Sequence, residues 1–414
     1  MKRKTTVKIK SLKAKEILDS KGMPTVEVKL KTDLGIFEAS APSGVSTGKY
    51  EAVELRDDDG KGVKKAVENV EKIIAPVLEK EDLIDQKRAD NILIQLDGTK
   101  NKSRLGSNAI LPVSIAVCRA LAKLEEIPLY KYIRKVRNSE LEVRNWHMPL
   151  PSFNMIEGGK HTHSKNSNQT KLAFQEFMVM PQSGSFKENL EIGKRIYGKL
   201  KEILKKKFKK TELSAEGAFA APVNTFEALD LIVEAGRGEN IKIAIDAAAS
   251  NFYQDNKYEF EGRAISKEDL GEIYREITPR YPVISIEDPF FEEGFEDFAE
   301  LKLKLNNKIL IIGDDLTVSN IERIKTAQEK NACSGLILKP NQIGTITETL
   351  EAANLAKSFG WKIMVSNRGG ETEDDFIADL AVGVGAEFIK SGAPYPKERM
   401  AKYNRLVKIE RELI

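Results

Sequence analysis

Six apolar runs in the second half of the chain end in charged or polar residues. The runs are IKIAIDAAAS, YPVISIEDPF, KILIIGDDLT, SGLILKPNQ, WKIMVSNRGG and AEFIKSG. The residues at their ends are Asp246, Glu287, Asp314, Lys339, Asn367 with Arg368, and Lys390. Carboxylates that meet at one mouth repel each other unless a cation joins them, and hard oxygen ligands suit Mg²⁺. The first three runs therefore predict a magnesium site, with helix N-caps or loop salt bridges as the alternative role of the same carboxylates.

Two of these runs end in lysine. Lys339 and Lys390 would lie close to the predicted cation, and a lysine beside Mg²⁺ has its pKa lowered, so that it can act as a base near neutral pH. A metal ion combined with a lysine base is suited to removing a proton next to a carboxylate. The alternative for either lysine is a plain ion pair with a neighbouring carboxylate.

The stretch MVSNRGGETEDDF, beginning at Met364, favours an anion site. Arg368 stands where the chain leaves an apolar run. Gly369 and Gly370 allow the backbone to come close to a ligand, and an acidic helix start follows.

Helical segments separate the six runs and predict the fold. The residues at the run ends are 23 to 41 positions apart, which is enough for one strand, one helix and two loops. Continuous apolar strands alternating with helices indicate a parallel sheet covered on both faces. Six such units favour a closed (β/α) barrel, whose active site forms at the carboxyl ends of the strands. The charged run ends would then converge on one rim.

The first part of the chain has a different pattern. TVEVKLKTD and LGIFEASAP alternate as strands do, while residues 62–79 and 108–124 have helical spacing. Residues 136–147 are charged and irregular, and we expect a linker there. The length of 414 residues makes two domains a reasonable expectation.

The composition limits the classes of partner. Charged residues are 31% and hydrophobic residues 41%, as in soluble globular proteins, and the net charge of +3 gives no drive toward nucleic acid or anionic membranes. Cys118 and Cys333 are far apart, which fits a reducing, cytoplasmic location and gives no Cys/His cluster for zinc. No apolar h-region follows the basic N-terminus, and we expect no stretch that approaches the roughly 18 apolar residues of a membrane span.

Several long blocks carry a family resemblance. They are EILDSKGMPTVEVKL, APSGVSTGKYEAVELRDDD, LDGTKNKSRLGSNAILPVSIAV, GDDLTVSN, LKPNQIGT and GGETEDDFIADLAVG. Together they resemble the enolases, over residues 16–413. The resemblance implies an α/β fold with an α+β capping domain over residues 1–137 and a modified (β/α)8 barrel over residues 138–414. It also implies Mg²⁺-dependent dehydration of 2-phosphoglycerate to phosphoenolpyruvate through an enolate, and enolase-superfamily sites are known to combine metal ions with a lysine or histidine base.

The resemblance also implies residue roles. The Mg²⁺ ligands would be Asp246, Glu287 and Asp314, with Ser46 closing over a second ion. The catalytic residues would be Lys339 as base, Glu216 as the protonated acid, and Glu176 as a second carboxylate beside it. The substrate-binding residues would be His161, Gln175, Arg368 and Lys390, together with the positions of Asn367 and Gly369.

Four departures from the enolase pattern fall at the phosphate and leaving-group end. The family usually reads SHRSGETED where this chain reads SNRGGETED, so Asn367 replaces a histidine and Gly369 a serine. Ala215 replaces an aspartate before Glu216, and the polar loop of residues 161–175 is longer than usual. His163 in that loop could stand in for the missing histidine or be a plain polar residue.

These departures leave three functions open. The first is a working enolase that has drifted. The second is a paralogue that makes the same enolate from another substituted 2-hydroxy acid or a phosphonate. The third is an enolase-like binding protein without turnover. The expected partners are a small phosphorylated acid and other copies of the chain, in a homodimer or higher homo-oligomer, with neither nucleic acid nor a membrane span.

Overall fold

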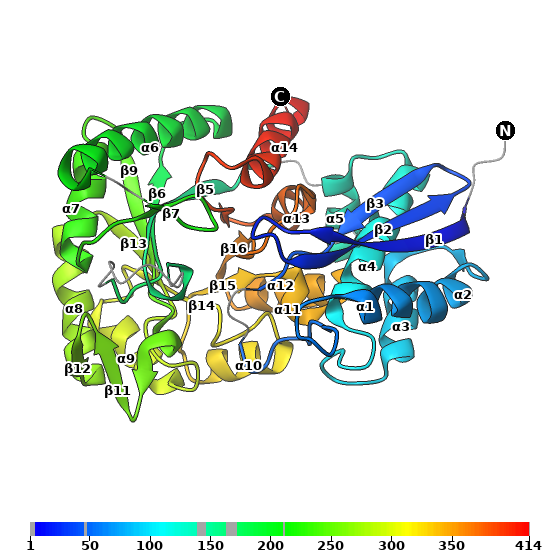
Figure 1. Cartoon of the computed structure of the whole chain (residues 1–414), viewed down its shortest axis with the longest axis horizontal. Helices are drawn as coiled ribbons and strands as arrows, with labels where there is room; N and C mark the ends of the chain where they lie inside the picture. Colours follow the sequence, from blue (N-terminus) through cyan, green and yellow to red (C-terminus); the bar gives the residue numbers. More distant parts are fainter. Residues whose placement is uncertain (1–4, 45–47, 139–145, 163–171, 210–211, 414) are drawn as a thin grey trace.

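The computed structural model describes residues 5–44, 48–138, 146–162, 172–209 and 212–413. Figure 1 shows two parts side by side: an N-terminal domain of one sheet and several helices, in blue and cyan, and a barrel surrounded by helices. The helix at the C-terminal end of the described chain lies against the barrel part.

An antiparallel sheet with strand order β3-β2-β1-β4 forms one layer of the N-terminal domain. Its strands are β1 (Val7–Leu18), β2 (Pro24–Thr32), β3 (Ile36–Ser40) and β4 (Asp82–Leu83). Buried and exposed residues alternate along β2, so that one face packs against the helices and the other faces solvent. The two strands predicted from alternation are β2 and β3.

Helices cover the inner face of this sheet. They are α1 (Lys64–Asn69), the π-helical segment η1 (Val70–Ile74), α2 (Ala75–Leu78), α3 (Gln86–Asp97), α4 (Ser107–Glu125) and α5 (Leu129–Asn138). The two predicted helical segments correspond to α1 through α2 and to α4. The prediction of a linker from residue 136 is wrong at its start, because α5 continues to Asn138. The domain boundary after residue 137 stays a prediction.

Helix α4 corrects one statement drawn from the sequence. By length and composition it could cross a membrane, although no stretch was expected to come near that limit. Its apolar window is 83% buried inside the protein, as in the core helix of a soluble fold. In this structure α4 packs against β2, β3, α3 and α5.

Eight strands close the barrel in the described part of the chain. They are β5 (Leu150–Glu157), β6 (Glu176–Pro181), β9 (Ile241–Asp246), β13 (Val283–Glu287), β14 (Leu310–Gly313), β15 (Gly335–Leu338), β16 (Lys362–Ser366) and β17 (Phe388–Lys390). They pair in the order β17-β16-β15-β14-β13-β9-β6-β5, and the pairing of β17 with β5 closes the ring. The six apolar runs are β9 and β13 to β17, and each of these strands is parallel to the next. The barrel prediction is therefore confirmed.

Strand β6 runs against its neighbours. It is antiparallel to both β5 and β9, and its first residue, Glu176, lies opposite Glu157 on one side and Asp246 on the other. Between β5 and β6 the described residues contain only the short 3-10 helix η2 (Gly159–His161). Antiparallel neighbours can be joined without a crossover, whereas parallel strands require one. The start of β6 consequently lies at the same rim as the carboxyl ends of the parallel strands.

Helices and short strands complete the barrel part. The helices are η2 (Gly159–His161), α6 (Phe186–Phe208), α7 (Thr225–Ala235), η3 (Ala249–Phe252), α8 (Lys267–Arg280), α9 (Phe295–Lys304), α10 (Ile321–Glu329), α11 (Pro340–Ile343), α12 (Ile346–Ser358), α13 (Phe376–Val384) and α14 (Lys397–Leu413). The short strands are β7 (Glu212–Leu213), β8 (Phe219–Ala220), β10 (Tyr253–Gln254), β11 (Lys257–Phe260) and β12 (Arg263–Ile265).

A small apolar cluster fills the barrel beneath the rim. Its buried members are Met178, Met180, Ala244, Ile312, Ile337, Met364 and Phe388. Most of them lie two positions from a rim residue, as Ala244 does from Asp246 and Phe388 from Lys390. Because alternate residues of a strand share a face, the sequence that builds the apolar floor also turns the charged rim residues inward.

The N-terminal domain is joined to the barrel near the rim. Ser43 and Gly370 exchange backbone hydrogen bonds of 2.7 and 2.9 Å. A Cβ atom on Gly370 would lie 2.2 Å from Asp19 Oδ2 and 2.4 Å from Ser43 Oγ, so the close approach of the two domains requires glycine here.

Candidate active site

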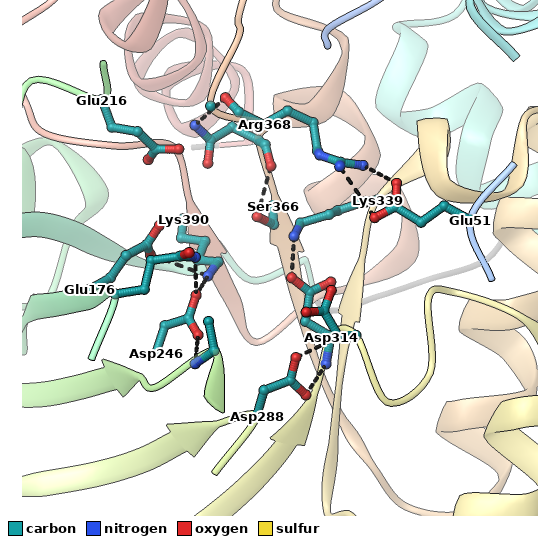
Figure 2. A pocket seen from close by; sticks show the side chains of 15 residues that line it. Glu51, Glu176, Glu216, Asp246, Asp288, Asp314, Lys339, Ser366, Arg368 and Lys390 are labelled. Atoms are coloured by element: carbon teal, nitrogen blue, oxygen red, sulfur yellow. Dashed lines mark hydrogen bonds and ion pairs between the residues drawn. The ribbon is translucent and has the colours of Figure 1, made fainter. Parts of the chain in front are cut away.

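A polar pocket lies at the barrel rim (Figure 2). Carboxylates outnumber cations among the described residues that line it. The acidic residues are Glu51, Glu176, Glu216, Asp246, Asp288, Asp314 and Asp315, and the basic residues are Lys339, Arg368 and Lys390. This excess of negative charge would repel an anionic substrate, so a pocket for such a substrate needs additional positive charge.

Asp246 and Glu287 are neighbours at the ends of β9 and β13. They are paired in the strand register, and both are buried. Lys390 Nζ joins them: it lies 3.2 Å from Asp246 Oδ2 and 2.7 and 2.8 Å from the two oxygens of Glu287. Burial, followed by the charge of Asp246, raises the pKa of Glu287 well above its usual value.

Asp314, the third predicted metal ligand, has other partners. It accepts hydrogen bonds from Lys339 Nζ and, at 2.8 Å, from Gln342 Nε2. Within the described residues, two groups of three carboxylates have oxygens that all lie within 4.8 Å of one another: Glu157, Glu176 and Glu216, and Asp288, Asp314 and Asp315. Asp314 is therefore grouped with its own loop and not with Asp246 and Glu287, although all three belong to the same rim.

The pKa of Lys339 is shifted in the opposite direction from the one expected beside a metal ion. Burial, the largest single cause, lowers the pKa of Lys339, yet the carboxylates around it, above all Asp314, bring the net pKa above 10.5. Burial raises the pKa of Asp314, but the charges around it, Lys339 first among them, bring the net pKa below its usual value. The expected lowering of the lysine pKa thus requires that another cation take the charge of Asp314.

Asp288 and Asp315 were not assigned from the sequence. Asp288 has a φ of 42° and accepts the backbone N–H groups of Asp314 (2.9 Å) and Asp315 (2.6 Å), so it holds the turn that carries both residues. Burial, followed by the charge of Asp314, raises the pKa of Asp315 to about 7. Two consecutive acidic residues at a strand end were the sequence signal for this arrangement.

Glu176 and Glu216 come together on the other side of the pocket, as the resemblance implied. Glu176 begins β6, whereas Glu216 lies in the turn between β7 and β8. Both are buried, and buried Glu157 at the end of β5 joins them. Lys390 Nζ contacts Glu176 Oε2 at 3.2 Å. Gln175 lies beside them, where its Nε2 donates to Asp246 Oδ2 at 3.3 Å and its Oε1 accepts from Asn251 at 3.1 Å.

Arg368 lines the pocket and is paired with the N-terminal domain. Its Nη1 and Nη2 donate to the two carboxylate oxygens of Glu51 at 2.7 and 3.3 Å, and Nη1 also donates to Asn341 Oδ1 at 3.2 Å. Arg368 and Glu51 are both 5% exposed. A guanidinium that binds one carboxylate end-on, through Nη1 and Nη2, has the geometry to bind an oxyanion.

Three departures from the enolase pattern, at Asn367, Gly369 and Ala215, lie around Arg368, whereas residues 163–171 of the long loop lie outside the described part of the chain. Asn367 Nδ2 donates to the backbone oxygen of Arg368 at 3.1 Å. The backbone oxygens of Gly369 and Ala215 accept from Arg399 Nη2 at 2.8 and 3.1 Å. Asn367 and Gly369 line the pocket, so both positions face the space where a substrate would lie.

The helix expected directly after Gly369 and Gly370 begins later, so its N-terminus is not part of the predicted anion site, whereas the anion-binding role of Arg368 stays a prediction. Helix α13 begins only at Phe376, and the Phe376 N–H donates to Asp374 Oδ1 at 2.9 Å. Asp374 is in turn held by Arg119 of α4 at 2.8 Å. The helix start is thus neutralised by the chain's own carboxylate, and Gly370 serves the contact between the domains.

Three predicted positions give no side-chain geometry. Ser46 and His163 lie outside the described residues, and the structure describes only the backbone of His161, in η2.

Sequence reasoning missed two buried residues that position the pocket. Glu51 binds Arg368 from the N-terminal domain. Arg399 on α14 binds the backbone oxygens of Arg368 and Gly369 at 2.7 and 2.8 Å and so ties the loop after β16 to the turn that carries Glu216. A fully buried arginine in a charged C-terminal helix gives no pattern in the sequence that would distinguish it from its exposed neighbours.

Both parts of the chain match known families. Residues 9–133 match the enolase N-terminal domain, and residues 145–414 match the enolase C-terminal TIM barrel domain. The chain belongs to the enolase family. Enolase-family domains over nearly the whole chain suggest an Mg²⁺-dependent enzyme of the lyase type.

The residues present fit Mg²⁺. The carboxylates of Asp246 and Glu287 offer hard oxygen donors on adjacent strands, and the pocket has more acidic than basic groups. In this enolase-family pocket Asp246 and Glu287 would hold the ion. The role of Asp314 as a third ligand stays a prediction, because its oxygens are grouped with those of Asp288 and Asp315.

Proposed function

We propose that this chain is a lyase that dehydrates 2-phosphoglycerate to phosphoenolpyruvate. The observation that carries the proposal is the arrangement of a lysine and a carboxylic acid around one pocket: Lys339 lies on one side and Glu216 on another (Figure 2). Removal of the C2 proton and of the C3 hydroxyl needs a base and an acid on separate sides of the substrate.

The side chains have distinct tasks in this proposal. Lys339, when neutral, takes the proton from C2. Glu216 gives a proton to the hydroxyl that leaves C3, with Glu176 beside it. Mg²⁺, when bound, supplies positive charge against the negative charge that develops on the substrate carboxylate. Lys390 would contact the same end of the substrate.

Arg368 would bind the phosphate. Its guanidinium now binds Glu51 with both Nη atoms, so a phosphate would either use other N–H donors of the guanidinium or take the place of Glu51. Charge-assisted bonds in a buried site are strong enough to hold the substrate while the pocket excludes water.

The test is direct. Purified protein is mixed with 2-phosphoglycerate and Mg²⁺, and the absorbance of phosphoenolpyruvate is followed. We expect turnover that EDTA abolishes and added Mg²⁺ restores. Absence of turnover under these conditions would reject the proposed substrate.

A second candidate is a paralogue that forms the enolate of another substituted 2-hydroxy acid or a phosphonate. Asn367 favours it, since this side chain lines the pocket where the family has a histidine, and an amide cannot carry a proton. Mg²⁺-dependent exchange of the C2 proton of an analogue into D₂O, without turnover of 2-phosphoglycerate, would support the paralogue. Failure of exchange with every 2-hydroxy acid tested would favour a binding protein without turnover.

The homo-oligomeric state and the cytoplasmic location stay predictions. The acidic pocket suits a small anionic substrate accompanied by cations.

A further inference from the structure

Lys390 reaches across the barrel mouth to three carboxylates. It ends β17, which pairs with β16 and β5, whereas the carboxylates begin β6 and end β9 and β13. Its Nζ lies 3.2 Å from Glu176 Oε2, 3.2 Å from Asp246 Oδ2, and 2.7 and 2.8 Å from the oxygens of Glu287 (Figure 2). Lys390 and the three carboxylates are each no more than 5% exposed at the side chain.

One ammonium cannot neutralise this group. It carries one positive charge and three N–H donors, while the three carboxylates carry three negative charges when ionised. The oxygens of Asp246 and Glu287 nevertheless turn toward the same nitrogen. The point between them is therefore already shaped for a cation, and when the carboxylates are ionised a single ammonium leaves them under-neutralised.

We propose that the Lys390 ammonium is a tethered counter-ion that competes with Mg²⁺ for Asp246 and Glu287. Binding of the metal is then an exchange, in which a divalent ion takes the two carboxylates and the lysine side chain withdraws from them. This inference rests on the proposed function, because it takes Asp246 and Glu287 to be magnesium ligands.

The exchange predicts that removing the lysine charge strengthens metal binding. Lys390→Met keeps much of the side-chain length without the charge, and Lys390→Arg keeps a positive charge. We expect the full-length Lys390→Met protein, titrated with Mg²⁺ without substrate in a calorimeter, to bind at least about tenfold more tightly than the wild type. Lys390→Arg should stay within about threefold of the wild type.

A matched control separates this effect from the loss of any buried ion pair. Lys102 is 3% exposed at the side chain and pairs with Glu348 at 2.8 Å, away from the pocket lining. Lys102→Met should lower the thermal midpoint without changing Mg²⁺ affinity. Lys390→Met should lower the midpoint in EDTA and recover more of it than the wild type when Mg²⁺ is added.

A measurement on the wild type keeps the test independent of how the variants fold. With ¹⁵N in the lysine Nζ positions, the signal that Lys390→Arg removes should shift or vanish on addition of Mg²⁺. An unchanged Lys390 signal at saturating Mg²⁺, or equal or weaker binding by Lys390→Met, would overturn the exchange.

The outcomes distinguish this inference from the proposed function. If neither the wild type nor Lys390→Met binds Mg²⁺, the metal assignment itself fails, and the proposed function fails with it. If the wild type binds Mg²⁺ and turns over 2-phosphoglycerate while Lys390→Met gains no affinity, only the exchange fails.

Discussion

The two sides of the pocket are held in different ways. The side of Asp246, Glu287, Lys339 and Lys390 is built from residues at or next to the ends of paired barrel strands, and its charged groups bind one another. The side of Arg368 is built from loops. There, distant segments such as Glu51 and Arg399 hold the chain in place.

This difference fits the positions at which the chain departs from the enolase pattern that it resembles. Arg399 binds the backbone oxygens of Arg368, Gly369 and Ala215, and every residue type offers a backbone oxygen. Side chains on the loop side can therefore change while the loops stay anchored. On the strand side each charged group neutralises another, so a change in one residue leaves a buried charge unpaired.

The variant with the largest expected effect tests the strand side of the pocket. Lys339→Ala should reduce exchange of the substrate C2 proton into D₂O by about 10²- to 10⁴-fold, since a positioned base contributes that much. The exchange is followed by proton NMR with Mg²⁺ present.

The control for this variant is Lys362→Ala. Lys362 begins β16, at the end of the strand away from the rim, and its side chain is 48% exposed. It should exchange the proton at the wild-type rate. If Lys339→Ala kept the wild-type exchange rate, the base would be another group. The charged residues of the strand side would then serve only to stabilise the fold.

A variant with a smaller expected effect tests the loop side of the pocket. Asn367→His restores a group that can carry a proton near the leaving hydroxyl, and we expect turnover of 2-phosphoglycerate to rise by about tenfold. Steady-state assays compare it with Asn367→Ala, which should not gain activity. An unchanged or lower rate in Asn367→His would mean that the loop side has not diverged in function at this position.

The smallest effect tests the acidic turn beside Lys339. The pKa of Asp315 is raised from 3.8 to about 7, so the folded state binds a proton more tightly than the unfolded state does. The Asp315 carboxyl group therefore lowers the free energy of unfolding as the pH rises from about 4 to about 7. The full destabilisation remains above that range. Asp315→Asn removes this cost.

The measurement is the thermal midpoint in a chelating buffer. Asp315→Asn should melt a few degrees higher than the wild type at about pH 8, and the difference should shrink at about pH 5. A difference that does not depend on pH would show that the raised pKa is not its cause.

Much of the fold could be predicted from local pattern. The apolar runs that end in Asp246, Glu287 and Lys390 are barrel strands, because a continuous apolar run suits a strand buried on both faces. The direction of β6 could not be predicted in this way. Glu176 begins its strand and still reaches the rim, and no local pattern states that a strand runs against its neighbours.

The sequence by itself determined the residue types of the site and the family. Asp246, Glu287, Lys339 and Lys390 follow apolar segments whose alternation decides which way each side chain points. The tertiary structure decided which groups bind one another. It placed Lys390 across the barrel on Asp246 and Glu287, and it turned Asp314 toward Lys339. These pairings depend on strand order around a closed ring and on desolvation inside it, and neither is a property of any one segment of the chain.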